Sequence, residues 1–290
     1  MSLSFTPEPD RPLAALTPQR RKVLVTGAAG NIGSSFAEHA RERYDLRLMV
    51  IGNEKRIEQI RPFGEVVTAD LSNLDRLKEL CRGIDTVLHL AANADPSTAW
   101  NELLQNNIVG TYNVMVAAKT AGCRREIYAS SIHAVSGYPP DVQVKTSEAV
   151  NPGDLYGVSK CFGEALGRYM AEREGLSVIA LRIGAFGPPE HVAKPGGHAM
   201  LDMFVSRRDL QQMFEKCIDV ENLRWAVFHA VSNNRFKRLD ITDARELIGY
   251  QPQDDAAEIN PDLRALHFPD HHHTASQRDK WQQSGLREQL

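Results

Sequence analysis

Short apolar runs alternate with longer segments of mixed polarity along most of the chain. Six of these runs have the length and the continuous apolar character of strands that are buried on both faces. They cover residues 22–27, 46–52, 65–70, 85–92, 125–131 and 177–184. The segments between most of them repeat their apolar residues with helical spacing, which predicts helices over 32–43, 74–81, 101–121 and 155–174. This alternation is typical of an α/β fold with a doubly wound parallel sheet.

The pattern changes after residue 184, where the remaining segments are shorter. They predict a loop over 187–197, helices over 200–204, 210–217 and 244–248, and an apolar strand over 225–231. We therefore expect a sheet domain over 21–184 and a small C-terminal substrate lobe over 185–266, not independent of it, which caps the carboxyl ends of the strands. Residues 1–20 contain four prolines and predict a flexible arm, and residues 267–290 predict a polar tail.

A glycine-rich turn directly follows the first predicted strand. Gly27, Gly30 and Gly33 are three residues apart, and Asn31 and Ile32 open the helix that comes next. Glycine permits a tight turn and a close approach of the backbone to a pyrophosphate, while the helix N-terminus offers free N–H groups. The sheet domain is therefore predicted to be a dinucleotide-binding Rossmann domain, with all five residues in contact with the cofactor.

The residue type at the end of the second strand determines whether NAD or NADP is bound. An acidic residue there binds the ribose hydroxyls, and a basic residue accepts a 2′-phosphate. Asn53 stands at the expected position and is followed by Glu54, Lys55 and Arg56. This leaves both nucleotides open, with a slight preference for the acceptance of NADP.

The end of the third strand also faces the expected cofactor site. Asp70 and Leu71 follow that strand and are placed to approach the adenine. Asp70 has a second interpretation as a helix cap.

A tyrosine and a lysine lie one helical turn apart in the segment 155–174. Tyr156 and Lys160 are four residues apart, so that their side chains share one helix face. Lowering a phenol pKa from ~10 to neutrality takes roughly 4 kcal/mol, and a cation at ~4 Å in an effective dielectric of about 20 supplies about that much. The pair can therefore act as a unit in proton transfer, provided that burial does not cost as much in return.

Composition and charge narrow the range of partners. The chain has 34 Lys and Arg against 37 Asp and Glu, with a net charge of −3 and no long block of one sign, which argues against a nucleic acid partner. The four cysteines form no Cys-x-x-Cys pair, so that we expect no metal site and reduced thiols in a cytoplasmic protein. No apolar run approaches the ~20 residues of a membrane span, so that we expect no membrane insertion. His271–His273 lie in the polar tail, and His89 is expected to be a core histidine.

Several motifs, in their order and spacing, resemble the extended short-chain dehydrogenase/reductase family over roughly residues 22–250. They are TGAAGNIG, DTVLHLAA, NNIVGTYNV, YASS and LYGVSK. The resemblance implies that Tyr156 is the general acid/base, that Lys160 holds the nicotinamide ribose and lowers the phenol pKa, and that Ser131 hydrogen-bonds the reacting oxygen. It also implies cofactor positions for Asn107, which supports the site from the central helix, and for Ala91 and Ala92.

Within that family the chain is most similar to uronate dehydrogenases, through SS-x-H, GYP, LYGVSKCFGE, LRIG and MLxxxxS. The resemblance places His133 and Ala185 beside the substrate, together with Ser131. Ile132 replaces an amide expected to contact substrate, and Ala199 replaces an arginine expected to bind a carboxylate. An alanine cannot provide that bidentate contact. Lys194 and His198 are the nearby cations that could provide a charge instead.

The implied reaction is a reversible hydride transfer between a hydroxyl or carbonyl carbon of a sugar- or uronate-like small molecule and nicotinamide, with Tyr156 moving the proton and Ser131 stabilising the oxyanion. Two alternatives have the same fold. One is a sugar-nucleotide epimerase or dehydratase that retains its cofactor, and the other is an NAD(P)-binding regulator without turnover. The resemblance also implies a homodimer.

Overall fold

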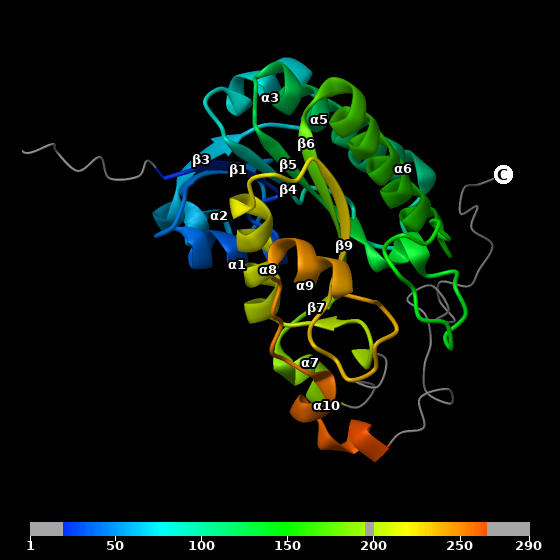
Figure 1. Cartoon of the computed structure of the whole chain (residues 1–290). Helices are drawn as coiled ribbons and strands as arrows, with labels where there is room; N and C mark the ends of the chain where they lie inside the picture. The colour runs from blue at the N-terminus through cyan, green and yellow to red at the C-terminus, as the bar shows by residue number, and fades with distance from the viewer. Residues whose placement is uncertain (1–19, 195–199, 266–290) are drawn as a thin grey trace, which may run out of the picture.

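The computed structural model describes residues 20–194 and 200–265, which form a parallel sheet with helices on both faces (Figure 1). The seven strands follow the order β3-β2-β1-β4-β5-β6-β9, and every neighbouring pair is parallel. They are β1 (Lys22–Thr26), β2 (Asp45–Val50), β3 (Glu65–Thr68), β4 (Thr86–His89), β5 (Arg125–Ser131), β6 (Ser177–Ile183) and β9 (Trp225–Ala230). The predicted doubly wound α/β fold is confirmed.

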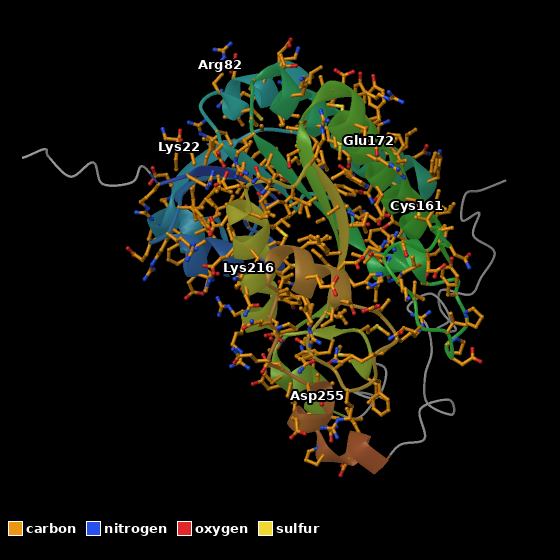
Figure 2. All side chains as sticks on the ribbon, viewed as in Figure 1. Lys22, Arg82, Cys161, Glu172, Lys216 and Asp255 are labelled. Atoms are coloured by element: carbon orange, nitrogen blue, oxygen red, sulfur yellow. The ribbon has the colours of Figure 1, made fainter. Side chains whose placement is uncertain are left out.

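Two layers of helices bury the two faces of this sheet. One layer contains α1 (Asn31–Ala40), α8 (Arg207–Asp219) and α9 (Thr242–Ile248), and the other contains α3 (Leu74–Cys81), α5 (Gly110–Thr120) and α6 (Leu155–Tyr169). Lys216 on α8 and Cys161 on α6 lie on opposite sides of the sheet (Figure 2). Fully buried strand residues alternate between the layers, as with Val23 against α1 and Leu24 against α3 and α5. Nonpolar burial on both faces explains why the strand segments are continuous apolar runs.

The predicted long helix over 101–121 is continuous but changes its winding. It starts as α4 (Trp100–Leu103), passes through the wider π-helical turns of η2 (Leu104–Val109) and ends as α5. Such π-helical turns often occur at functional sites. The predicted helix over 155–174 likewise consists of α6 and the π-helical segment η4 (Met170–Glu174).

The segment expected to form the lobe contributes to both parts of the molecule. Its helix α8 and its strand β9 belong to the main layers, while the remaining elements gather at the carboxyl end of the sheet (Figure 1). These are β7 (Ala185–Phe186), α7 (Pro189–Ala193), β8 (Phe204–Val205), α10 (Ala256–Ile259) and the 3-10 turns of η6 (Pro261–Ala265). Almost all of the predicted arm and the whole of the predicted tail lie outside the described residues.

The predicted helix over 200–204 is wrong. Phe204 and Val205 form strand β8, which pairs with β7, and the backbone N–H of Ala185 donates to the carbonyl of Met203 at 2.7 Å. Every residue of 201–205 is buried, so that the apolar run reflects a short segment enclosed on all sides rather than one face of a helix. The predicted loop over 187–197 also contains the short helix α7.

The order of the strands locates the crevice in which a ligand binds. From β1 the chain proceeds outward to β2 and β3, and it then returns to β4 on the other side of β1. The crossover connections diverge between β1 and β4, which is the topological switch point of an open α/β sheet. In the described ranges, no helix is both long enough and apolar enough to cross a membrane.

Candidate functional site

The glycine turn between β1 and α1 is shaped by two close backbone approaches. A Cβ atom on Gly27, whose φ is +65°, would lie 3.0 Å from the backbone of Ala91, and one on Gly33 would lie 2.4 Å from the carbonyl oxygen of Gly27. Gly30 caps α1 without a side chain, so that the first N–H groups of the helix are left for another acceptor. A cradle that excludes side chains and ends in a helix N-terminus fits the diphosphate of a dinucleotide.

Two cavities lie along the carboxyl ends of the strands and share Leu90, Ala92 and Ala94. The adenosine-side cavity, of about 450 Å³, is lined by Gly27, Gly30, Met49, Val50, Ile51, Glu54, Asp70, Leu71, Leu90, Ala91, Ala92, Asn93, Ala94 and Asn106. The catalytic cavity, of about 440 Å³, is lined by Ile32, Leu90, Ala92, Ala94, Pro96, Ala129, Ser130, Ser131, Ile132, His133, Tyr156, Lys160, Ile183, Gly184, Ala185, Phe186, Met200 and Met203. The two cavities together form a groove across the switch point.

Most of the residues selected from the sequence line this groove, but four do not. Asn53, Gly33 and Asn107 line neither cavity, and Asn31 faces a separate cavity on the outside of α1. Gly33 is nevertheless required inside the turn. The structure thus brings together two groups that are far apart in the sequence, one for each end of a dinucleotide.

Glu54 is the acidic residue at the end of β2 that the sequence pattern missed. Its carboxylate accepts hydrogen bonds from the backbone N–H groups of Ile51 at 2.9 Å, Gly52 at 2.8 Å and Asn53 at 3.1 Å. Glu54 follows the expected position by one residue, and its side chain folds back over the strand end. Arg56, by contrast, faces the separate cavity outside α1.

Asp70 lines the adenosine-side cavity and stabilises its own turn. Its carboxylate accepts a hydrogen bond from the N–H of Ser72 at 2.8 Å, and the hydrogen bonds to Ser72 lower the pKa of Asp70. The cap of α3 is Asn73, which accepts from the N–H of Arg76. The interpretation of Asp70 as a helix cap is therefore wrong.

Tyr156 and Lys160 project from one face of α6 into the catalytic cavity. Asp154 caps this helix by accepting from the N–H of Gly157 at 2.7 Å. The Nζ atom of Lys160 lies 5.5 Å from the ring centroid of Tyr156 and donates to the carbonyl of Ala129 at 2.8 Å. Both side chains are almost fully buried.

Burial dominates the proton affinities of this pair. It raises the pKa of Tyr156 to about 12, against a smaller lowering by a hydrogen bond from Ser131 and a raising by Asp154. It lowers the pKa of Lys160 to about 7. The expected lowering of the phenol pKa is therefore not present in the chain by itself, because burial outweighs the hydrogen bond from Ser131. A further positive charge is needed to lower the phenol pKa, and the cationic ring of an oxidised nicotinamide would supply it.

A second phenol lies on the other side of the lysine. The ring centroid of Tyr128, on β5, is 5.2 Å from the Nζ atom of Lys160, so that the ammonium lies between two aromatic rings. Tyr128 is 1% exposed, and a Cβ atom on Gly163 would lie 2.3 Å from its hydroxyl oxygen. The absence of a side chain on Gly163 thus lets α6 approach β5 closely enough to place Lys160 between the rings.

Asn107 supports the catalytic helix from behind. Its side chain donates to the hydroxyl of Ser159 at 3.0 Å and to the carbonyl of Asn93 at 2.9 Å, and it accepts from the N–H of Asn93 at 2.8 Å. Ser159 in turn donates to the carbonyl of Tyr156 at 2.7 Å. The π-helical turn around Asn107 therefore connects the loop after β4 to the turn that carries the phenol.

His133 faces the catalytic cavity and is oriented by an aspartate. Its Nδ1 atom lies 2.7 Å from a carboxylate oxygen of Asp154, and its ring makes an edge contact with Tyr156 at 5.2 Å between centroids. Ser131 accepts from the N–H of His133 at 3.2 Å, which fixes the start of the turn η3 (Ile132–Val135). Asp154 was missed because only its role as a cap is visible in the sequence.

His89 lies beneath the cavity as a core histidine. Its Nδ1 atom is 2.8 Å from the hydroxyl of Thr26, which also accepts from the N–H groups of Leu90 and Ala91. Burial lowers the pKa of His89 to about 3, so that the ring is neutral. Nowhere in 20–194 and 200–265 do three or more His, Cys, Asp or Glu side chains gather in a way that could hold a metal ion. His198, Ala199 and His271–His273 lie outside those ranges.

Comparisons with known proteins agree with this geometry. The model of the NAD dependent epimerase/dehydratase family matches residues 23–224. The chain is 34% identical over 255 residues to an NAD-dependent glucose-6-phosphate dehydrogenase of Haloferax volcanii, with 82% of this chain and 95% of that protein covered. It is 33% identical over 258 residues to an L-arabinose 1-dehydrogenase (NAD(P)(+)) of the same organism, with 82% and 98% covered.

A solved structure of a dehydrogenase is also similar in fold to this chain. The crystal structure of uronate dehydrogenase from Agrobacterium tumefaciens superposes with a TM-score of 0.76 at 29% identity, over 86% of this chain and 90% of that chain. The similarity therefore extends through both the sheet and most of the elements that cap it.

Proposed function

Because this chain belongs to the NAD dependent epimerase/dehydratase family, we propose that it is a dehydrogenase that transfers a hydride between a sugar-like small molecule and nicotinamide. The membership confirms the resemblance to the extended short-chain dehydrogenases/reductases. The observation that carries the proposal is the position of Tyr156, Lys160 and Ser131 around one cavity that continues into the glycine turn. The names of the relatives, which are dehydrogenases of glucose 6-phosphate, L-arabinose and uronates, support a sugar-like substrate.

In this mechanism the nicotinamide supplies the hydride acceptor or donor. Ser131 and Tyr156 hold the reacting oxygen from two sides, and Tyr156 takes or gives its proton. Lys160 is held near its midpoint of protonation at neutral pH, with a pKa of about 7, and its ammonium form stabilises the phenolate. All three side chains are largely buried, which strengthens their electrostatic interactions.

We further propose that NAD is preferred to NADP, contrary to the slight preference drawn from Lys55 and Arg56. The carboxylate of Glu54 occupies the backbone N–H groups at the end of β2, where it can bind ribose hydroxyls. A 2′-phosphate placed there would meet a negative charge of the same sign. Both cations are exposed, and neither lines the adenosine-side cavity.

An epimerase with a retained cofactor is the second candidate. A UDP-galactose 4-epimerase superposes with a TM-score of 0.69 but at 22% identity, which supports the shared fold alone. The relatives at 33% and 34% identity are named as dehydrogenases, which favours net oxidation.

The experiment is a panel of sugars, sugar acids and simple alcohols, with NAD and NADP in parallel, followed by the absorbance of the reduced cofactor. We expect net formation of NADH with at least one sugar-like compound. Interconversion of a sugar without any net change of cofactor would support the epimerase instead. Binding of NAD without turnover of any compound would support a regulator.

A further inference from the structure

The catalytic cavity has a polar wall and an apolar wall. Ser131, His133, Tyr156 and Lys160 carry polar groups and come from the end of β5, from η3 and from α6. Ile132, Met200 and Met203 are apolar side chains of the same lining, which we call the apolar wall. A bound molecule therefore meets polar groups at its reacting oxygen and apolar side chains at another part of its surface.

The apolar wall is the surface of a packed core rather than a set of mobile side chains. Ile132 and Met203, which are 7% and 5% exposed, belong to one buried cluster that continues into the lobe. The other buried members of that cluster are Val135, Val144, Val231, Leu239 and Ile241. Met200 packs against a second cluster around Phe204 and α10. Turning a polar group into this wall would require repacking of both clusters.

Among the lining residues that the structure describes, the basic groups lie near the reacting end of the cavity. Among the described lining residues, the basic groups are Lys160, which is bound to the carbonyl of Ala129, and His133, which is bound to Asp154. Lys194 is not among the lining residues. A carboxylate or phosphate placed against the apolar wall would lose its hydration without gaining a cation from that wall, which is unfavourable.

On the premise of the proposed function, we propose that the substrate is a neutral sugar whose end remote from the reacting carbon is a C–H surface, such as a 6-deoxyhexose. Ile132, Met200 and Met203 bind that surface and select against sugars that carry an anion there. The thioether side chains of the two methionines adapt to an irregular aliphatic outline.

The test compares sugars that differ only at carbon 6. The galacto series is D-fucose, D-galactose and D-galacturonate, and the gluco series is 6-deoxyglucose, glucose, glucuronate and glucose 6-phosphate. In the series with the preferred configuration, we expect kcat/KM to be highest for the 6-deoxysugar and lower by on the order of 100-fold or more for the anionic sugars. The neutral hydroxymethyl sugar falls between them.

A uronate or a sugar phosphate that is oxidised as fast as the matched 6-deoxysugar overturns this inference and leaves the dehydrogenase intact. Failure of all seven sugars to reduce NAD, with NAD binding retained, overturns the sugar dehydrogenase itself. The two failures are therefore distinguishable in one experiment.

Variants at Ile132 provide an independent measurement. Ile132→Asn places an amide in the apolar wall, and we expect it to reduce the preference for the 6-deoxysugar over the uronate by at least about 10-fold. Ile132→Val keeps an apolar β-branched side chain and should retain the preference. Equal preferences in the two variants, both with unchanged NAD affinity, contradict the assignment of Ile132 to substrate selection.

Discussion

The glycine turn and the apolar wall border the same groove, yet they are built from different parts of the chain. The turn is backbone, and its shape depends on Gly27 and Gly33 having no side chains. The apolar wall consists of the side chains of Ile132, Met200 and Met203, which come from two distant segments. A backbone cradle tolerates few residue types, whereas a wall of side chains changes its chemistry with each substitution. Substrate choice can therefore change through side chains while a backbone cradle is kept.

Among the effects on cofactor binding, the largest is expected at the cradle. In Gly33→Ala, the new Cβ would lie 2.4 Å from the carbonyl oxygen of Gly27, so that the turn and α1 must separate. We expect NAD affinity to fall on the order of 100-fold, equivalent to about 3 kcal/mol. Isothermal titration with NAD measures it.

Gly83→Ala is the matched control for this change. Gly83 has a φ of +71° and no atom within 4 Å of the new Cβ, so that the substitution strains the backbone away from the groove. It should cost about 1 to 2 kcal/mol of stability and leave NAD affinity unchanged. Native NAD affinity in Gly33→Ala would show that the close approach does not shape the site.

The preference for NAD over NADP tests how the Glu54 side chain contributes to cofactor binding. Glu54→Gln keeps the shape of the side chain but removes the charge beside the ribose site. We expect the ratio of kcat/KM for NADP to that for NAD to rise about 10-fold, equivalent to ~1.4 kcal/mol. Glu58→Gln makes the same change of charge on the exposed helix α2 (Ile57–Ile60) and should leave the ratio unchanged. A ratio that does not move in Glu54→Gln excludes this carboxylate as the selector.

A smaller effect is expected beneath the lysine. Tyr128→Leu removes the ring face that stabilises the ammonium of Lys160, an interaction of roughly 0.5–2 kcal/mol. We expect kcat/KM to fall several-fold and the apparent pKa in its pH profile to move downward, because the charged lysine is less favoured. Tyr128→Phe retains the ring and should restore both. If the Leu and Phe variants have the same pH profile, Tyr128 contributes packing alone.

A separate effect is on stability rather than on activity, and it follows from the lowered pKa of Lys160. In the folded chain this pKa is about 7, against an ordinary value of 10.5, so that the unfolded state binds more protons between these pH values. Lys160 therefore destabilises the fold most below pH 7, and this penalty fades as the pH rises towards 10.5. The stability gained in Lys160→Met should decrease over that window, by up to about 1.4 kcal/mol per pH unit. Urea unfolding at several pH values measures it, and a gain that is independent of pH would contradict the burial of a titrating ammonium.

The sequence pattern predicted the elements whose structure depends mainly on residues close together in the chain. The continuous apolar runs located the buried strands, and the spacing of Gly27, Gly30 and Gly33 located the turn that follows β1. The interval of four residues between Tyr156 and Lys160 was sufficient to place both on one helix face.

Contacts between distant segments could not be predicted in this way. The strand β9 was expected in the lobe but pairs with β6, and residues 201–205 are buried by elements far away in the sequence. The pairing of His133 with Asp154, and the fold of the Glu54 side chain onto the strand end, depend on loop geometry that no spacing reveals. The raised pKa of Tyr156 also depends on the depth of burial, which a motif does not encode.

The central claim is that the phenol of Tyr156 moves a proton in a reaction carried by bound nicotinamide. The most direct measurement compares wild type and Tyr156→Phe in kcat and in the Kd for NAD. We predict that kcat for the preferred sugar falls on the order of 1,000-fold while the Kd for NAD stays within about twofold, because the hydroxyl serves the proton transfer rather than the binding of the cofactor. Retention of the wild-type kcat in Tyr156→Phe would contradict the account.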